Sequence, residues 1–388
     1  MRQDGLRLFL TKYVDRFFPG MATAESLDSD PLVGPTRNTP TLLRQAFARR
    51  PRKVKSRRPL PPPHQLRAFH IGGYWRGPND MVRQMMLGLR GTGAEVYEYN
   101  TDEHREALDC EGRPYDRGTF GPVWLRWEVL REEVLSFRPH LIICNAGGLS
   151  FRPEVAGDLR RHTRLLGIVL SDPDVFELTT RHIAQNFDLL LTNAPESIPR
   201  YAERGVRVAQ LPIATHEGFF LPMPPRPEYA CEVLVLGAEH SDRIEPVRSL
   251  LKRFDTHVHG EGWTRHGIVS RGVIYGQDVL SALNSARIAV IFSRTRAGSQ
   301  VVKVGLFDFI AAGALVATER FPEVEQYLEF GREVIGFTSL PEMLEQIEYY
   351  LSHPAEAEAT RQAGRERVLH QHTWGQVWPR LLAEMPSS

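Results

Sequence analysis

Short apolar runs alternate with helical segments from residue 66 onward, and this pattern indicates a sheet-based α/β protein. The apolar runs of a first series lie at 66–73, 94–100, 141–147, 164–172, 187–193 and 207–214. Each run is apolar throughout rather than at every second position, which is typical of parallel strands covered on both faces. Helical stretches such as 123–137 fall between the runs. The first series therefore predicts one doubly wound domain.

A second series of the same kind follows residues 220–229, which hold four prolines in ten residues and predict an interdomain linker. Its predicted strands are 231–237, 256–262, 272–276, 287–293, 314–319 and 333–337. Helices are predicted at 340–352, at 355–371 and from Trp374 to about Met385. The chain is thus predicted to form two Rossmann-like, doubly wound domains that face a cleft. The predicted limits are 1–65 for an amino-terminal extension, 66–214 and 228–370 for the two domains, and 371–388 for a helix that crosses back to the first domain.

The first 65 residues differ from the rest of the chain. Apolar residues recur there at helical spacing up to Pro19 and predict a helix; they are Leu6, Phe9, Leu10, Tyr13, Val14, Phe17 and Phe18. Between Pro31 and Asn79 there are eleven Lys or Arg and no acid, which predicts a basic, proline-stiffened linker. Two interpretations stay open. The helix docks on the body with a solvated linker behind it, or residues 37–67 contact an anionic membrane surface or an acidic partner.

Composition narrows the class of protein further. The net charge is +1, so the chain outside the basic tract carries about −10. Nucleic acid is not an expected partner, because the basic residues are not interleaved with aromatic residues that stack on bases. Three distant cysteines show no metal spacing, and the amino terminus lacks the apolar core of a signal peptide. We therefore expect a cytoplasmic protein, peripheral to the inner membrane face if the basic tract binds there, with no cofactor and no metal.

Candidate chemistry in the first domain lies where predicted strands end, because ligands of open parallel sheets bind outside the carboxyl ends of the strands. Gly72 and Gly73 end the first strand; they form a tight turn or let the backbone approach a ligand. His70 precedes them and is either a core residue or points into the cleft. Asp172 and Asp174 end another strand, where Asp-Pro-Asp is either a helix-capping turn or a pair of catalytic carboxylates.

The second domain carries the residue types that bind a diphosphate. Its strand ends supply two glycines, a serine and three basic residues, which are Gly237, Gly260, Ser299, Arg243, Arg294 and Lys303. The arginines are also compatible with plain surface positions. Asp308 follows Lys303 in an apolar helix, where it either caps the first turn or accepts hydrogen bonds from ribose hydroxyls. In the second interpretation, Asp308 is expected to lie outside the core.

Several short motifs in residues 303–374 occur together in one known family. They are Phe307-Asp308, the small-residue turn 311–314, Thr318-Glu319, 330–333 and the segment 364–374, which ends in His372, Thr373 and Trp374. This stretch resembles the carboxyl-terminal domain of glycosyltransferase group 1 proteins, particularly the CgeB-like (spore maturation protein) branch. Weaker similarity extends the resemblance over most of residues 165–375.

The resemblance implies a GT-B fold, with a nucleotide-sugar donor bound mainly by the second domain, an acceptor bound mainly by the first, and no obligatory metal. It places Asp308 where the family usually has Glu, as the residue that holds the donor ribose. Lys303 stands near a position where the family often has Arg and would face the diphosphate. His372 and Thr373 correspond to a tract that we interpret as domain packing.

The implied activity is transfer of a hexosyl or related group from a nucleotide-diphosphate sugar to an unidentified acceptor. Loss of turnover is the first alternative, because Asp308 replaces the expected Glu; the chain would then be a nucleotide-sugar-binding or assembly protein with the same fold. A dinucleotide-dependent oxidoreductase is the second alternative. It is disfavoured because neither domain has GxGxxG followed by an acid about twenty residues later.

Overall fold

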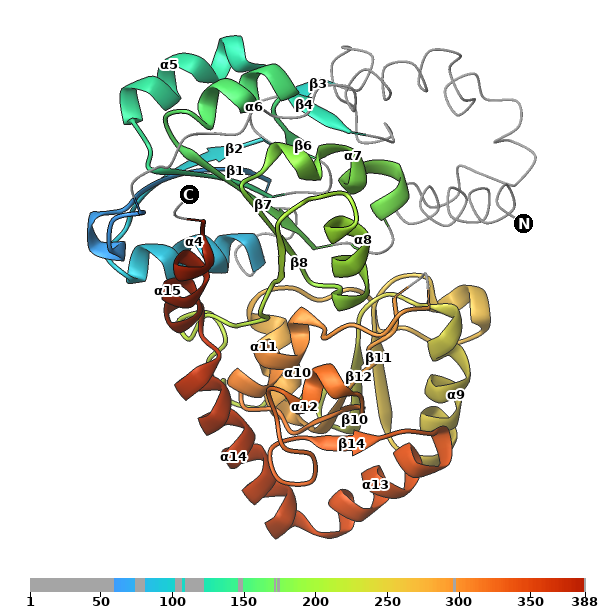
Figure 1. The fold of residues 1–388 in the computed structure, drawn as a ribbon. Coiled ribbons are helices and arrows are strands. Elements are labelled where there is room, and N and C mark those ends of the chain that lie inside the picture. Colours follow the sequence, from blue (N-terminus) through green and yellow to red (C-terminus); the bar gives the residue numbers. More distant parts are fainter. Residues whose placement is uncertain are drawn as a thin grey trace, which may run out of the picture.

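The computed structural model describes residues 59–73, 81–101, 107–108, 122–145, 149–170, 172, 175–295 and 298–386 (Figure 1). The predicted helix at 6–18, most of the basic tract 37–67 and Asp174 lie outside these residues. The described chain forms two parallel sheets, one above the other in Figure 1, with helices around both. The predicted α/β class with two parallel sheets is confirmed.

The first sheet has the strand order β2-β1-β5-β7-β8-β9, and every pair in it is parallel. Its strands are β1 (Arg67–Gly72), β2 (Glu95–Asn100), β5 (Leu141–Asn145), β7 (Arg164–Val169), β8 (Leu189–Thr192) and β9 (Val208–Gln210). All six lie within the predicted apolar runs of the first series. The central strands β5 and β7 are buried at every position, as strands covered on both faces should be.

Helices cover both faces of the first sheet. Successive residues of each strand point to opposite sides, so the apolar strands present apolar side chains to the helices on each face. Ala68 and Ile143 pack in the cluster that contains α4 (Met81–Gly91), whereas Phe69 and Ile142 pack in the cluster that contains α5 (Trp127–Phe137). The remaining helices of this part are α6 (Pro153–Leu159), the π-helix η3 (Phe176–Thr180), α7 (Arg181–Ile183) and α8 (Ile198–Ala202).

A small third sheet, which the sequence did not predict, joins β3 (Ala107–Leu108), β4 (Val123–Leu125) and β6 (Leu149–Ser150). Strands β3 and β4 are antiparallel, and β4 and β6 are parallel. The predicted helix at 123–137 is therefore wrong in its first residues, since Val123–Leu125 is a strand and the helix begins at Trp127. Three consecutive buried apolar side chains in β4 explain the error, because such a short run does not distinguish a strand from a helix.

The second sheet has the order β11-β10-β12-β13-β14 and is also entirely parallel. Its strands are β10 (Cys231–Leu236), β11 (Thr256–His259), β12 (Ala286–Ile291), β13 (Val316–Glu319) and β14 (Ile335–Phe337). The predicted strand at 272–276 is absent. Gly272 and Gly276 have φ values of 88° and 55°, which are incompatible with an extended strand, and they turn the backbone ahead of the helix that begins at Gln277.

Within the described residues, six α-helices surround the second sheet. Buried residues of α9 (Ile244–Arg253) and α13 (Leu340–Ser352) pack on one face, and those of α10 (Gln277–Ser285), α11 (Val304–Ala311) and α14 (Pro354–Gln371) pack on the other. The short α12 (Pro322–Glu325) follows β13. Short 3-10 turns lie before or between the elements of both sheets. They are η1 (Pro63–Gln65), η4 (Ala184–Asn186), η5 (Pro195–Ser197), η6 (Pro227–Tyr229), η7 (Ser241–Arg243) and η8 (Trp263–His266).

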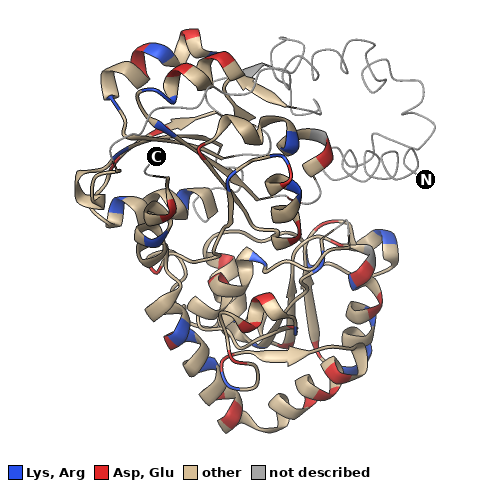
Figure 2. Cartoon of the chain, viewed as in Figure 1, with Lys and Arg blue, Asp and Glu red and all other residues tan. Residues whose placement is uncertain are grey.

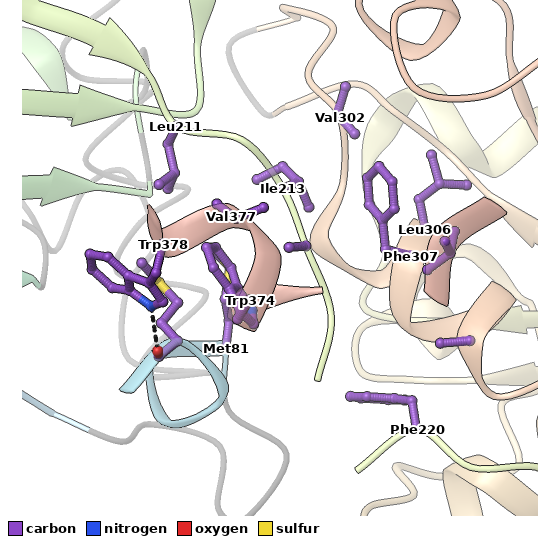
Figure 3. Packing of buried hydrophobic residues seen from close by; sticks show 14 of the residues in the cluster. Met81, Leu211, Ile213, Phe220, Val302, Leu306, Phe307, Trp374, Val377 and Trp378 are labelled. Atoms are coloured by element: carbon purple, nitrogen blue, oxygen red, sulfur yellow. Dashed lines mark hydrogen bonds between the residues drawn. The ribbon is translucent and has the colours of Figure 1, made fainter. Parts of the chain in front are cut away.

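The last helix, α15 (Trp374–Glu384), packs against α4 beneath the first sheet (Figure 1). Trp374 and Trp378 are fully buried in this contact, and the indole Nε1 of Trp378 donates a 2.6 Å hydrogen bond to the carbonyl of Met85 (Figure 3). A capping box at Thr373 starts the helix. The same apolar cluster continues through Ile213 to Phe307 of α11, so one core joins the surroundings of both sheets.

Acidic and basic residues are mixed along α14, whereas α13 carries Glu342, Glu345 and Glu348 and no Lys or Arg (Figure 2). Cys144 and Cys231 are buried free thiols, as predicted, and burial raises their pKa values to about 12 and about 11. None of the helices in the described residues is both long and apolar enough to span a membrane.

Candidate functional site

The carboxyl edge of the second sheet holds an arginine at the point where the strand order reverses. The chain runs from β10 to β11 on one side and then to β12 on the other, so the switch point lies between β10 and β12. Arg243 spans it. One of its terminal nitrogens donates to the carbonyl of Ala238 after β10 at 3.2 Å, and the other donates to the carbonyl of Phe292 after β12 at 3.3 Å. The sequence-predicted arginine therefore lies at the place where an open parallel sheet binds ligands.

A carboxylate from the next strand lies near Arg243. Glu319 ends β13, and its Oε2 accepts a 2.7 Å hydrogen bond from the backbone N–H of Ser293. Burial raises the pKa of Glu319, while the charge of Arg243 and the bonds from Ser293 act in the opposite direction. Arg243 is half-buried, so a ligand anion at this edge would meet a guanidinium that is held in place rather than a mobile surface side chain.

The two predicted glycines of this edge bring strand ends together. Gly260 has a φ of 149°, and a Cβ at this position would overlap the carbonyl of Gly237. The N–H of Gly237 donates to the carbonyl of His259 at 2.9 Å, and the indole Nε1 of Trp263 donates to the carbonyl of Gly237 at 2.9 Å. Glycine at position 260 is thus required by the close approach of β10 and β11.

Arg294 and Ser299 belong to a turn that follows β12. A guanidinium nitrogen of Arg294 donates to the carbonyl of Gly298 at 3.0 Å, and the carbonyl of Ser299 accepts from the N–H of Thr295 at 2.8 Å. The side chain of Arg294 is exposed. The turn leads directly to Lys303, which is half-buried and immediately precedes α11.

Asp308 lies in the interior of α11, and the interpretation of this residue as a helix cap is wrong. It is the fifth residue of a helix that begins at Val304, so it lies beyond the first turn, where caps act. Its exposed fraction is 6%. The expectation that Asp308 would lie outside the core is also wrong, because α11 turns this residue toward the crossing between the two sheets.

At this junction between the two sheets, Asp308 belongs to a hydrogen-bond network that links four segments of the chain. Its Oδ1 accepts a 2.8 Å hydrogen bond from the hydroxyl of Thr215, and the side chain of Gln84 on α4 also bonds to it. Gln84 in turn accepts from the N–H of His216 at 3.0 Å. Thr215 exchanges backbone hydrogen bonds with the segment before α15, at 3.0 Å to the carbonyl of His372 and 2.9 Å from the N–H of Trp374. Burial raises the pKa of Asp308 to about 8, so the carboxyl is mostly protonated at neutral pH.

Asp308→Asn is expected to remove a pH dependence of stability. The folded pKa of about 8 lies above the ordinary value of 3.8, so the folded state retains a proton that the unfolded state has lost, and stability falls as pH rises through this window. The buried histidines, whose pKa values are lowered in the folded state, contribute the same slope to the wild type and to the variant, so their effect cancels in the comparison. Between about pH 6.5 and 8.5 the wild-type melting temperature should fall by on the order of 5 °C more than that of the variant. Parallel melting curves would contradict this assignment.

The first sheet has its own switch point, between β1 and β5, because β2 lies on the other side of β1. His70 of β1 is fully buried there, and its Nε2 is hydrogen-bonded to Oδ1 of Asn145 at the end of β5. Burial lowers the pKa of His70 to about 4, so the imidazole is neutral at physiological pH. Gly72 lies against this pair, and Gly73 follows it and is buried. His70 is thus a core residue located at the switch point.

Asp172 is held in a closed set of hydroxyl contacts. Its carboxylate accepts hydrogen bonds from Thr180 at 2.9 Å, Thr192 at 3.1 Å and Tyr201 at 2.6 Å, and its exposed fraction is 1%. These contacts tie the end of β7 to η3, β8 and α8. The interpretation of Asp172 as a base for an acceptor hydroxyl is therefore not supported by its surroundings, which give it a structural role. Its partner in that interpretation, Asp174, lies outside the described residues.

Three residues of these sites had not been singled out from the sequence. Gln84 is a buried polar residue on the apolar face of α4, and a polar residue in such a stripe is a signal that could have been found. Thr215 and Asn145 carry no comparable signal, because each becomes notable only through a contact far away in sequence. Among the described residues, no group of three His, Cys, Asp or Glu side chains is placed to hold a metal ion.

Comparison with solved structures identifies the architecture as the GT-B fold. Sucrose-phosphate synthase from Thermosynechococcus elongatus matches with a TM-score of 0.55 and 14% identity, over 82% of this chain and 100% of that one. Trehalose 6-phosphate synthase from Burkholderia multivorans matches with 0.52 and 12%, over 82% and 98%. HepE from Anabaena in complex with UDP-glucose matches with 0.52 and 10%, over 82% and 99%.

The carboxyl-terminal part of the chain is glycosyltransferase-like. Residues 241–383 match a protein-family model described as glycosyl transferase-like, and this range includes Arg243, Lys303 and Asp308. No curated protein matches the chain. The predicted GT-B fold is thus confirmed, and the similarity to glycosyl transferases extends over residues 241–383.

Proposed function

We propose that this protein is a glycosyltransferase of the CgeB-like branch that transfers a hexosyl or related group from a nucleotide-diphosphate sugar. The observation that carries the proposal is the position of Arg243, which lies at the switch point of the second sheet and inside the glycosyl transferase-like region. Ligands of open parallel sheets bind at such points, and a fixed guanidinium there suits a diphosphate.

The chemistry requires charge to be stabilised on the departing nucleoside diphosphate. In this proposal, Arg243 and Lys303 meet that charge, since both come from loops at the carboxyl edge of the second sheet. The residues present fit a metal-independent reaction of this kind. Arg294 and Ser299 lie in the turn that follows β12 and leads to Lys303. Both residues would border the same ligand.

Asp308 is proposed to contact the donor ribose. A ribose hydroxyl pair would meet a carboxyl that already accepts from Thr215 and Gln84, so donor binding would alter contacts at the junction of the two sheets. Because the carboxyl is mostly protonated at neutral pH, we expect these hydrogen bonds to be weaker than those of a charged carboxylate. The acceptor is proposed to bind on the side of the first sheet, near Gly72 and Gly73.

The ligand and the products named for structural neighbours are consistent with this proposal. HepE was solved with UDP-glucose, and the sucrose-phosphate and trehalose 6-phosphate synthases are named for sugar products. For this chain, we extend the proposal to a cytoplasmic location and to contact of residues 37–67 with an anionic membrane surface or an acidic partner. The proposed contact rests on the eleven basic residues and the absence of acids between Pro31 and Asn79.

A nucleotide-sugar screen tests the proposed activity. UDP-, GDP-, dTDP- and ADP-linked sugars are each added to the full chain, and the melting temperature is measured; at least one should raise it, because a ligand that binds only the folded state stabilises it. The stabilising donor is then assayed for hydrolysis and for transfer to mixed acceptors. Stabilisation without turnover would favour the non-catalytic alternative, whereas stabilisation by NAD alone would contradict both.

A further inference from the structure

A buried polar pair lies at the switch point of the first sheet, and the side-chain amide nitrogen of its asparagine is unsatisfied within the described residues. Asn145 is 1% exposed, and its Oδ1 is bonded to Nε2 of His70. Its other amide atom, Nδ2, has no partner anywhere in the described residues. A buried amide donor without a partner destabilises the folded state, so such an atom requires an explanation.

Local packing holds this pair in place. A Cβ on Gly72 would lie 2.6 Å from the backbone oxygen of Asn145, 2.7 Å from its Oδ1 and 2.9 Å from Nε2 of His70. Only glycine at position 72 therefore leaves room for the amide and the imidazole to meet. The pair lies at the ends of β1 and β5, the two strands between which the order of the first sheet reverses.

The geometry points to His70 and Asn145 as a binding site for an uncharged hydroxyl group of a sugar. Asn145 makes the contact, and His70 acts as a positioning residue that orients the amide. The inference rests on the proposed function and adds to it a recognition site on the first sheet.

The chemistry of the pair selects a neutral ligand group. The amide carries no charge, and burial keeps the imidazole neutral, so nothing in the pair itself would compensate a phosphate or a carboxylate. The positive charge that acts on His70, Arg90, is already paired with Glu98. A hydroxyl is both donor and acceptor, so it satisfies the amide whichever of the two amide atoms faces it.

The hydroxyl could belong to the donor sugar or to the acceptor, and Asn145→Ala distinguishes the two sources. The probes are UDP-glucose and UDP, or the corresponding pair selected by the screen, and then glucose, N-acetylglucosamine and glycerol added to UDP-saturated protein. If the donor sugar is held, the variant should bind UDP-glucose about five- to tenfold more weakly and UDP unchanged. If an acceptor is held, the affinity for UDP-glucose should stay constant. The affinity for glucose, N-acetylglucosamine or glycerol should then fall by a similar factor.

Two further variants separate this role from a structural one. Gly72→Ala inserts a methyl group against the pair and should reproduce the affinity pattern of Asn145→Ala. Asn186→Ala is the matched control, because Asn186 is equally buried but its amide is satisfied by Ser150 and Phe151 at 3.1 and 2.9 Å. It should lower the melting temperature and leave all affinities unchanged. Unchanged affinities in Asn145→Ala would overturn the inference, whereas a wild type that binds no nucleotide sugar would instead overturn the proposed function.

Discussion

Trp378→Ala is expected to lower the free energy of unfolding by about 3–5 kcal/mol, the range for removing a large buried aromatic side chain. Trp378 is fully buried between α15 and α4, in the cluster that continues to α11 beside the second sheet. Truncation would leave a cavity there and would also leave the carbonyl of Met85 without its 2.6 Å hydrogen bond. Urea denaturation followed by tryptophan fluorescence and by circular dichroism would measure the loss.

Trp378→Phe is the matched control for this experiment. Phenylalanine retains most of the apolar volume and lacks the indole N–H, so this variant should lose only about 1–2 kcal/mol, mostly from the unpaired carbonyl. A loss of less than 1 kcal/mol in the free energy of unfolding of Trp378→Ala would show that packing of α15 contributes little to stability. That result would conflict with the shared core in Figure 3.

Arg243→Ala is expected to weaken binding of the nucleotide-diphosphate sugar by about ten- to a hundredfold, which corresponds to roughly 1.4–2.8 kcal/mol. The reason is that Arg243 supplies a fixed positive charge at the switch point of the second sheet. Calorimetric titration with the donor selected by the screen would measure the change. The melting temperature of the free variant would show whether loss of the two carbonyl contacts also affects the fold.

Two controls accompany Arg243→Ala. Arg243→Lys retains the charge but cannot reach both carbonyls as a planar fork does, so its affinity should lie between those of the wild type and Arg243→Ala. Arg248→Ala changes the net charge equally on the exposed part of α9, where Arg248 bonds to the carbonyl of His266. It should leave donor affinity unchanged. Equal losses in Arg243→Ala and Arg248→Ala would mean that only the overall charge matters.

The two parallel sheets were predictable from the sequence because their strands are buried on both faces. In β5 and β7 every residue is buried, and this requirement appears in the sequence as uninterrupted apolar runs. The exceptions have local causes. The run 272–276 is apolar enough for a strand, but its flanking glycines adopt positive φ, and Val123–Leu125 was too short to separate from the helix that follows.

The candidate site was less predictable, because its residues act through contacts between distant segments. The interpretations of Asp308 and Asp172 considered only their own strand ends and turns. In the structure, Asp308 meets Thr215 and Gln84, and Asp172 meets three hydroxyls from later elements. The position of Arg243 at the sheet edge could be predicted because an arginine that follows a strand is recognisable from local sequence alone.

A structure of the protein with a bound nucleoside diphosphate tests the central claim most directly. The account predicts that the diphosphate lies at the carboxyl ends of β10 and β12, within hydrogen-bonding distance of Arg243, and that the ribose lies beside Asp308. A nucleotide bound at the first sheet, or away from both switch points, would contradict the assignment of the second sheet as the donor side.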